Sequence, residues 1–427
     1  MSEYDRVDVV IVGGGIIGLA IAWRARQAGM SVVVLERDRV GWGTSRVAAG
    51  MLAPVAEVEF GEGGRRVLEL GLCSAAMWPA FARELEERTG VAVGLMATGT
   101  LVAARDEDDA RELERQLELR RSLGLAVRRL RASQARELEP ALAPTVRLAL
   151  EAPDDHSVDP RLALAALERA CRSAGVEVRE HASVARVELE GGPAEHARDP
   201  ASGRSGPRAR VTGVTLVDGS TVPAGQVVLA AGPWSEHIQG PWAGAGVPVR
   251  PVKGQILRLR DPAGPGLLAR VLRFRGGYLV PREDGAYVLG ATVEERGFEL
   301  APTAGGVYEL LRDAHELVPG ITELHIEELS VGLRPGTPDN VPLVGPGDAH
   351  GLVWATGHYR NGILLAPLTA ELVVGLLAGG EASPLLSVCS PERFRTPAER
   401  AAPGPIHAER GEAAEPAQVT EAVEPVT

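Results

Sequence analysis

The hydrophobic pattern at the start of the chain predicts a strand, a helix and a second strand. Residues 7–12 are almost all apolar, as in a strand that is buried on both faces of a sheet. The segment 16–28 is long enough and apolar enough for a buried helix, and Gly29 is predicted to end it. A further apolar run over residues 31–35 closes with Glu36. This order indicates an α/β protein with a parallel sheet.

Helical and strand patterns alternate through the rest of the chain. Helices are predicted over residues 65–89, 106–123, 133–138, 159–174, 303–317 and 362–377. Short strands are predicted over residues 101–104, 176–178, 211–217 and 227–231, with a strand-rich segment over residues 247–293. Within that segment, Glu283, Asp284 and Gly285 form a hairpin turn between strands 278–280 and 286–291.

Two segments lack such patterns. Residues 191–208 are rich in Gly, Pro, Ala and charge, and we expect a surface loop within a β-hairpin there. Residues 393–427 are rich in Ala, Pro and Glu with few aromatics, which predicts a disordered tail. A length of 427 residues exceeds one ordinary core, so about two domains are expected. No internal repeat is visible.

The composition narrows the range of partners. A hydrophobic content of 45% and a charged content of 24% are typical of globular proteins. The net charge of −12 is spread along the chain, which argues against nucleic acid, because phosphate binding needs a clustered basic face. No signal peptide and no span of about 20 uninterrupted apolar residues are visible. We therefore expect a cytoplasmic protein without a membrane partner.

The cysteines suggest neither a disulfide framework nor a metal site. Cys73, Cys171 and Cys389 are scattered, and no metal-ligand spacing is present. No Ser/His/Asp constellation is found either. We expect three passive thiols in a reducing compartment.

A glycine motif follows the first predicted strand. Gly13, Gly15 and Gly18 satisfy G-x-G-x-x-G and open the predicted helix. The first glycine allows a tight turn, the second lets the backbone approach a pyrophosphate, and the third allows close packing of helix and strand. The helix dipole then favours the phosphate charge. Glu36 follows at about the distance where a carboxylate accepts hydrogen bonds from a ribose hydroxyl.

FAD is favoured over a nicotinamide cofactor. An NADP enzyme needs a positive charge for the 2′-phosphate, which Glu36 opposes, although Arg37 follows it directly. The motif lies at the extreme N-terminus. A second apolar strand over residues 227–231 ends at Gly232, where a glycine again allows close approach to a ligand.

At this point the chain resembles the D-amino-acid oxidase superfamily and, within it, glycine oxidase of thiamine biosynthesis. The resemblance covers about residues 5–380. It rests on the segments 10–18, 48–54, 278–282, 290–294, 332–339 and 357–367. The first is shared by many flavoproteins, whereas Ala-Gly-Met-Leu-Ala-Pro at 49–54 and His-Tyr-Arg-Asn-Gly-Ile-Leu at 358–364 are more specific to glycine oxidase.

The resemblance implies an α/β fold with two discontinuous domains and a homotetramer. A Rossmann-like, glutathione-reductase-type FAD-binding domain would comprise residues 1–90, 151–235 and 334–392. A substrate domain built on an antiparallel sheet would comprise residues 91–150 and 236–333.

It also implies which residues hold FAD. Ile16, Ile17, Glu36 and Arg37 should contact the ADP moiety, and Val184 the adenine side. Thr44, Ser45, Ala49, Gly50 and Met51 should line the flavin and its pyrophosphate. The ring should be closed over by His358, Tyr359, Arg360, Asn361, Gly362, Ile363 and Leu364. The helix after Gly362 should point its positive end at the flavin and stabilise the reduced anion. No Cys lies in residues 354–367, so noncovalent FAD is expected.

The resemblance places the substrate carboxylate on Arg334, with Arg360 and Tyr278 assisting. A guanidinium suits a carboxylate because its planar fork makes two parallel hydrogen bonds. Other interpretations stay open: Arg334 as a structural ion-pair residue, Arg360 as a residue serving the flavin or the fold, and Tyr278 as a core tyrosine. His358 is interpreted as a flavin contact held by its backbone, with a proton carrier as the alternative.

The implied reaction is oxidation of glycine by FAD and dioxygen to glyoxylate, ammonia and hydrogen peroxide, with the imine available for thiazole synthesis. Sarcosine and small D-amino acids are further candidate substrates. Three alternatives remain: a sarcosine or D-amino-acid oxidase, a D-amino-acid dehydrogenase with another acceptor, and a flavin-binding protein without turnover.

Overall fold

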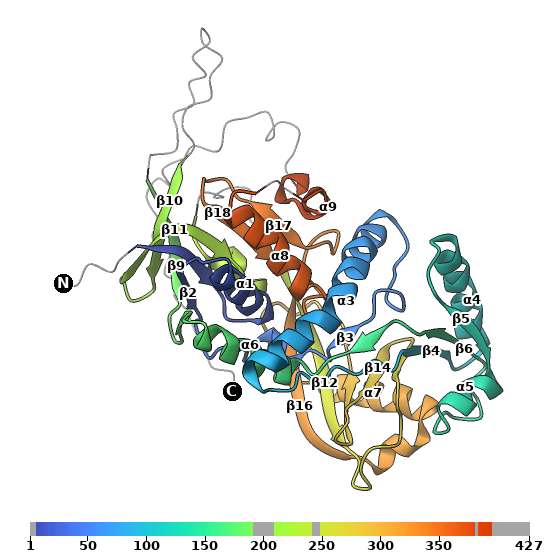
Figure 1. Ribbon diagram of the computed structural model, residues 1–427. Helices are drawn as coiled ribbons and strands as arrows, with labels where there is room; N and C mark the ends of the chain where they lie inside the picture. The colour runs from blue at the N-terminus through green and yellow to red at the C-terminus, as the bar shows by residue number, and fades with distance from the viewer. Residues whose placement is uncertain (1–5, 191–208, 241–247, 381–382, 395–427) are drawn as a thin grey trace, which may run out of the picture.

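The computed structural model describes residues 6–190, 209–240, 248–380 and 383–394. Two large sheets organise this part of the chain, and Figure 1 shows them at opposite ends of the molecule. The loop predicted over residues 191–208 lies outside the described residues. So does the predicted tail from residue 395 onward.

The first sheet is built around parallel strands. Its strands run in the order β17 (Leu343–Pro346), β18 (Leu352–Thr356), β11 (Thr221–Leu229), β1 (Val7–Val12), β2 (Val32–Leu35), β8 (Glu177–Arg179). Strands β18, β11, β1, β2 and β8 are parallel, and β17 is antiparallel to β18. An antiparallel pair extends from β11, namely β10 (Arg210–Leu216) and β9 (Val184–Glu190). The predicted α/β class is confirmed.

The second sheet is mostly antiparallel. Its strands run in the order β16 (His325–Gly336), β12 (Arg250–Arg260), β15 (Ala286–Gly290), β14 (Gly277–Pro281), β13 (Val271–Phe274), β4 (Thr100–Ala104), β6 (Leu148–Ala152), β5 (Arg128–Arg131). One pair departs from the expected antiparallel arrangement, because β13 and β4 run parallel. These two strands come from distant parts of the chain, so no hairpin forces them to be antiparallel. The predicted hairpin is confirmed, since β14 and β15 pair antiparallel around the turn.

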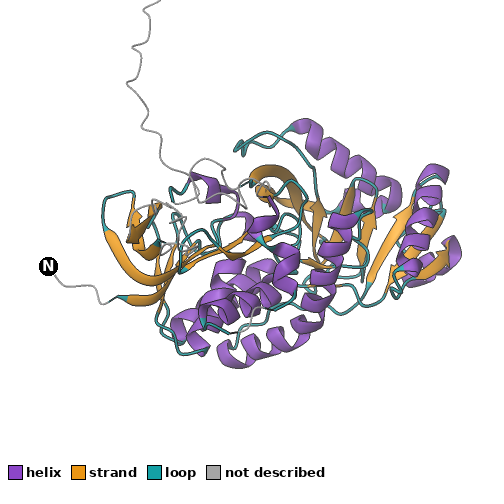
Figure 2. Ribbon diagram, turned by 90° about the horizontal axis from the view of Figure 1, so that it is seen from above, coloured by secondary structure: helices purple, strands orange, loops and turns teal. Residues whose placement is uncertain are grey.

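Four helices form a layer on one face of the first sheet. They are α1 (Ile16–Gln27), α3 (Glu62–Thr89), α6 (Pro160–Ser173) and α8 (Ala366–Leu377). Within this layer, α3 packs on α6 and α8. Figure 2 shows this group of helices on one side of the strands. Asp159 begins α6 by accepting hydrogen bonds from the amides of Arg161 and Leu162. Helices α4 (Glu107–Ser122), α5 (Ala132–Leu138) and α7 (Ala304–Leu317) belong with the second sheet.

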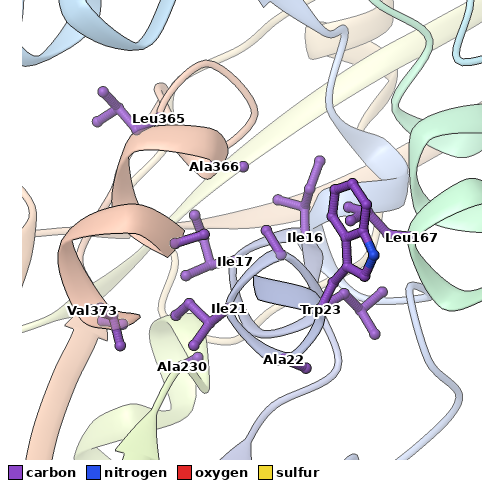
Figure 3. Packing of buried hydrophobic residues seen from close by; sticks show 14 of the residues in the cluster. Ile16, Ile17, Ile21, Ala22, Trp23, Leu167, Ala230, Leu365, Ala366 and Val373 are labelled. Carbon is purple, nitrogen blue, oxygen red and sulfur yellow. The ribbon is translucent and has the colours of Figure 1, made fainter. Parts of the chain in front are cut away.

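The core of the first layer is centred on α1. Figure 3 shows Trp23 on the side of Leu167 from α6, and Ile17 and Ile21 toward Val373 from α8. Trp23 also meets Phe81 of α3 edge-to-face, with ring centroids 5.4 Å apart. Full burial of such a side chain stabilises the fold by about 1.5–3 kcal/mol. This packing fixes the N-terminus of α1 against the sheet.

Two predicted boundaries are wrong at the C-terminal end. The helix predicted from Gly362 begins at Ala366, because residues 362–365 form a turn. It is not the last helix, since α9 (Leu385–Cys389) and the 3₁₀ helix η3 (Pro391–Phe394) follow. Arg393 belongs to η3 and pairs with Asp339, with Nε 2.9 Å from Oδ2. The structured part of the chain therefore extends past the predicted start of the tail.

The remaining elements of the fold are short connections. The short helix α2 (Thr44–Val47) and strand β3 (Met51–Leu52) follow β2, and β3 pairs with β7 (His156–Ser157). The 3₁₀ helix η1 (Gly232–His237) follows β11, and a second one, η2 (Pro319–Glu323), follows α7.

Candidate active site

A cavity of about 450 Å³ extends from the glycine turn of the first sheet to strands β12–β16 of the second. It brings together residues that are far apart in the sequence. The predicted site residues that line it are Gly13, Gly15, Ile16, Ile17, Glu36, Arg37, Thr44, Ser45, Ala49, Gly50, Met51, Val184, Gly232, Tyr278, Arg334, His358, Tyr359, Arg360, Gly362 and Ile363. Three predicted site residues do not line it, namely Gly18, Asn361 and Leu364.

The glycine turn needs its glycines for steric reasons. Gly13 has a φ of +109°, and an added Cβ would lie 2.5 Å from the carbonyl oxygen of Ala230. A Cβ on Gly18 would overlap the carbonyl oxygen of Gly13. Gly18 therefore serves helix–strand packing from behind the cavity, which explains why it does not line it. Gly15 caps α1 without a side chain of its own, and its backbone lines the cavity at the helix N-terminus.

Glu36 at the end of β2 orders its own loop. Its Oε2 accepts a hydrogen bond from the amide of Gly14 at 2.8 Å, and its Oε1 accepts one from the amide of Asp38 at 3.0 Å. The Arg37 guanidinium stacks on the Trp234 ring, with Cζ 3.8 Å from the centroid. Both lie at the cavity wall, so this stack closes the end of the cavity nearest β2. Trp234 was missed as a site residue, although it directly follows Gly232 and Pro233 in the sequence.

The middle of the cavity is formed by residues 48–51, which are clamped from two sides. Gly50 has a φ of +81°, and an added Cβ would overlap the carbonyl oxygen of Val158. The buried Arg282 donates from Nη2 to the carbonyl of Ala49 at 2.6 Å and pairs through Nε with Asp159 at 3.3 Å. Arg282 was missed as a positioning residue, although it belongs to a segment that carries the resemblance.

Helix α2, which precedes residues 48–51, connects the two sheets. Ser45 Oγ accepts a hydrogen bond from the amide of Ile16 at 3.1 Å, at the start of α1. Thr44 Oγ1 donates to the carbonyl of Leu333 at 2.7 Å, on strand β16. Helix α2 thus ties the glycine turn to the strand that carries Arg334.

His358 follows β18 and is buried. Its Nε2 lies 3.0 Å from Thr369 Oγ1. Burial lowers the pKa of His358 from 6.5 to about 3, so the imidazole is neutral near pH 7. A neutral, buried ring fits the interpretation as a contact held in place rather than a proton carrier.

The next residues form a corner against β16. Tyr359 has a positive φ of 46°, and its amide donates to the carbonyl of Pro335 at 2.9 Å. Leu364 does not line the cavity, and its carbonyl accepts hydrogen bonds from Ser74 and Trp78 of α3 at 2.6 and 2.9 Å. Helix α8 starts beyond this turn, so Gly362 and Ile363 line the cavity as turn residues rather than as a first helical turn.

Arg334 and Tyr278 meet at the far end of the cavity. Arg334 Nη1 donates to the carbonyls of Thr292 at 3.1 Å and Lys253 at 3.4 Å. Its guanidinium lies against Gly254, where an added Cβ would be 2.6 Å from Cζ. Burial raises the pKa of Tyr278, although the positive charge of Arg334 opposes the shift, so the phenol is neutral near pH 7. The two side chains offer a fixed cation beside a neutral hydroxyl.

Arg360 occupies the outer part of this end. Its side chain is 34% exposed, and Nη1 lies 3.4 Å from Oε1 of Glu59. Its Cζ lies 5.1 Å from the centroid of the Tyr359 ring. Two further charged residues that were missed line the same end, Glu57 and Arg273. Arg273 lies on β13 opposite Tyr278 of β14. Its nearness in sequence to Tyr278 was the one feature that could have marked it as a site residue.

Comparisons with known proteins identify the family to which the chain belongs. A family model described as FAD-dependent oxidoreductase matches residues 8–376. The chain belongs to this family of FAD-dependent oxidoreductases. It is 37% identical over 374 residues to glycine oxidase from Geobacillus kaustophilus, covering 87% of this chain and 93% of that one. The crystal structure of glycine oxidase from that organism superimposes with a TM-score of 0.79 at 34% identity, covering 90% and 98% of the two chains.

A fused relative is equally similar. The chain is 37% identical over 396 residues to the bifunctional protein ThiO/ThiG of Synechocystis, which covers 91% of this chain and 54% of the relative. The chain thus spans about half the length of this bifunctional protein and nearly all of the stand-alone glycine oxidase.

The oxidoreductase family binds FAD, and the residues of this flavoprotein fit that cofactor. An added Cβ at Gly13, Gly15 or Gly50 would press on neighbouring protein atoms, so these glycines let the backbone pack closely there. The backbone of all three lines the cavity, where it suits the close approach of a ligand. In the described part of the chain, no helix is long and apolar enough to cross a bilayer. The same residues contain no cluster of three side chains suited to a metal ion.

Proposed function

We propose that this flavoprotein oxidises glycine to glyoxylate and ammonia, with dioxygen reduced to hydrogen peroxide. The observation that carries the proposal is the Arg334 guanidinium, which is fixed by two backbone carbonyls beside the Tyr278 hydroxyl. The similarity to glycine oxidase over almost the whole length of both chains supports glycine as the substrate. Sarcosine and small D-amino acids are further candidates for the same site.

Arg334 binds and orients the substrate. Its guanidinium pairs with the α-carboxylate through charge-assisted hydrogen bonds, and the Tyr278 hydroxyl assists. Arg360 covers the outer side of the pocket. With the carboxylate held, the Cα–H bond has one orientation relative to the cofactor, and this positioning is the main contribution of the protein. The amine loses its proton to solvent.

The glycine turn and residues 44–51 hold the cofactor. The N-terminus of α1 would hold the pyrophosphate, Glu36 and Arg37 would contact the ADP moiety, and Val184 would lie on the adenine side, since all of these line the cavity. FAD bound there would supply the redox chemistry of the reaction, as hydride acceptor for the substrate and electron donor to dioxygen. Noncovalent attachment stays a prediction of this proposal; among the described residues that line the cavity there is no cysteine.

A role in thiamine biosynthesis follows from the fused relative. In the bifunctional protein ThiO/ThiG the matching half is joined to a second half. We infer that the imine formed from glycine by this flavoprotein supplies thiazole synthesis. The cytoplasmic location, the homotetramer and the two discontinuous domains stay predictions of the same proposal.

An oxygen electrode tests the proposed function. Purified yellow protein is supplied with glycine, sarcosine and D-alanine, and oxygen uptake and peroxide release are recorded. Glycine is expected to give the highest kcat/KM. Flavin bleaching by glycine under nitrogen without oxygen uptake in air would indicate a dehydrogenase. Failure of every amine to bleach the flavin would contradict catalysis and support a binding protein.

A further inference from the structure

A second charged pair lies at the substrate end of the cavity. Glu57 and Arg273 both line it, and Arg273 Nη2 lies 3.4 Å from Glu57 Oε1. The two side chains are 14% and 20% exposed, so the pair is largely withdrawn from solvent. Neither residue has a part in binding FAD or the α-carboxylate in the function proposed above.

The segment that carries Glu57 is held by buried ionisable side chains. Asp155 accepts hydrogen bonds from the amides of Val55 at 3.1 Å and Ala56 at 2.5 Å. Arg120 donates to the carbonyls of the same two residues, each at 2.9 Å. Arg273 donates to the carbonyl of Ala56 at 2.5 Å. The amides and carbonyls of two successive residues are thus bound by three ionisable side chains.

Such binding of the backbone at residues 55–56 by buried side chains is unusual for a connecting segment. Loop backbone normally satisfies its polar groups with water at the surface. Here Asp155 is 0% and Arg120 1% exposed, and removing such groups from water is costly. Burial raises the pKa of Asp155 to about 7, although its hydrogen bonds from the amides of Ala56 and Val55 oppose the shift. Burial lowers the pKa of Arg120 only to about 10, so it stays charged near pH 7. The position of Glu57, the next residue, is therefore set by groups that come from α4 and from the turn before β7.

The charge of Glu57 reaches the substrate-binding side chains. It adds to the effect of burial in raising the pKa of Tyr278. The substrate end contains three guanidiniums, those of Arg273, Arg334 and Arg360, and Glu57 offsets one of them. Without Glu57, Arg273 would be a second cation able to bind a second carboxylate.

We propose that Glu57 determines the charge of the substrates that the site accepts: it occupies Arg273 and repels a second carboxylate, so that monocarboxylic amines are preferred. Arg120 and Asp155 are positioning residues that hold Glu57 in place. This inference rests on the proposed amino-acid oxidation and adds a selectivity rule to it.

Two isosteric substrates test the rule. Iminodiacetate carries a second carboxylate, and N-(carbamoylmethyl)glycine carries a neutral amide in its place. The ratio of their kcat/KM values measures discrimination by charge alone. Glu57→Gln is expected to raise the iminodiacetate-to-amide ratio about tenfold, in the range measured for partly desolvated charges. Arg273→Gln is expected to lower it, because Glu57 then acts unopposed. A ratio within twofold of wild type in Glu57→Gln would overturn the proposal.

The positioning role is tested by a cycle of variants. Arg120→Lys and Asp155→Asn are expected to shift the ratio in the same direction as Glu57→Gln, and to have no further effect in the Glu57→Gln background. Thermal unfolding is recorded for each variant. A loss of stability and kcat with an unchanged ratio would show a merely structural role and contradict the assignment.

The test separates this inference from the proposed function. If the wild-type holoenzyme oxidises no amine, the proposed function fails. The ratio is then measured as the dissociation constants of the two ligands, from the perturbation of the bound flavin spectrum. Turnover of glycine together with a charge-independent ratio would overturn the selectivity rule alone.

Discussion

The guanidinium of Arg334 occupies the space beside Gly254 that a side chain would otherwise fill. An added Cβ at Gly254 would lie 2.6 Å from Cζ of Arg334, and its three nearest atoms all belong to that guanidinium. The two residues lie on the paired strands β12 and β16, where Val252 faces Arg334 and Gly254 faces Gly332. The orientation of the Arg334 guanidinium therefore depends on a glycine that lies 80 residues earlier in the chain (334 minus 254).

Arg334→Ala is expected to raise the KM for glycine about 100-fold while FAD stays bound. The loss of a charge-assisted, two-pronged hydrogen bond to the carboxylate corresponds to about 3 kcal/mol. Steady-state kinetics and the flavin absorbance of the purified variant measure the two effects. Loss of FAD with an unchanged KM in the residual holoenzyme would contradict the role of Arg334.

Gly254→Ala tests the relationship between the two residues. The added methyl group displaces the end of a flexible side chain rather than backbone, so the fold should tolerate it. We expect the KM for glycine to rise about tenfold with near wild-type thermal stability, because Arg334 leaves its place. Added to Arg334→Ala, the substitution should raise KM no further. Additive effects of the two substitutions would show that Gly254 acts by another route.

Gly50→Ala is expected to cost both stability and FAD. Its φ of +81° is disfavoured for alanine by about 1–2 kcal/mol, and the Cβ would also overlap the carbonyl oxygen of Val158. Gly29→Ala is the matched control, since Gly29 has a φ of +90° but no atom within 4 Å of the added Cβ. The melting temperature and flavin content of both variants are compared. If both variants lost the same stability and flavin content, backbone strain alone would explain the effect, and the steric clash at Gly50 would be excluded as a cause.

The buried His358 predicts a dependence of stability on pH. Its folded-state pKa of about 3 lies below the unfolded value of 6.5, so between these values unfolding takes up a proton. The contribution is present above about pH 6.5 and is lost as the pH falls, at a slope of at most about 1.4 kcal/mol per pH unit. Urea unfolding of wild type and His358→Gln is measured from pH 7.5 to 4.5. Wild type is expected to lose more stability than the variant, and parallel profiles would refute the assignment.

Several features of this protein could be predicted because their causes are local. The strand–helix–strand start, the glycine turn and the hairpin around residues 283–285 depend on hydrophobic period and on backbone conformations that glycine permits. The start of α8 was placed four residues too early, at Gly362 instead of Ala366. The helical pattern of apolar residues continues through the preceding turn, so the sequence alone does not show where the helix begins. The turn is held by hydrogen bonds from Ser74 and Trp78 of α3 to the carbonyl of Leu364, and these residues are distant in the chain.

The sequence by itself determined the class of fold, since a dinucleotide-binding turn between two apolar strands is visible in one segment. The roles of Arg334 and the other site residues stay predictions that rest on the family resemblance. Only the tertiary structure decided how the site is assembled. The parallel pairing of β4 with β13, the space at Gly254 for Arg334, and the meeting of Glu57 with Arg273 each join residues far apart in the chain. The register of strands decides such contacts, and that register follows from the packing of the whole molecule rather than from any local pattern.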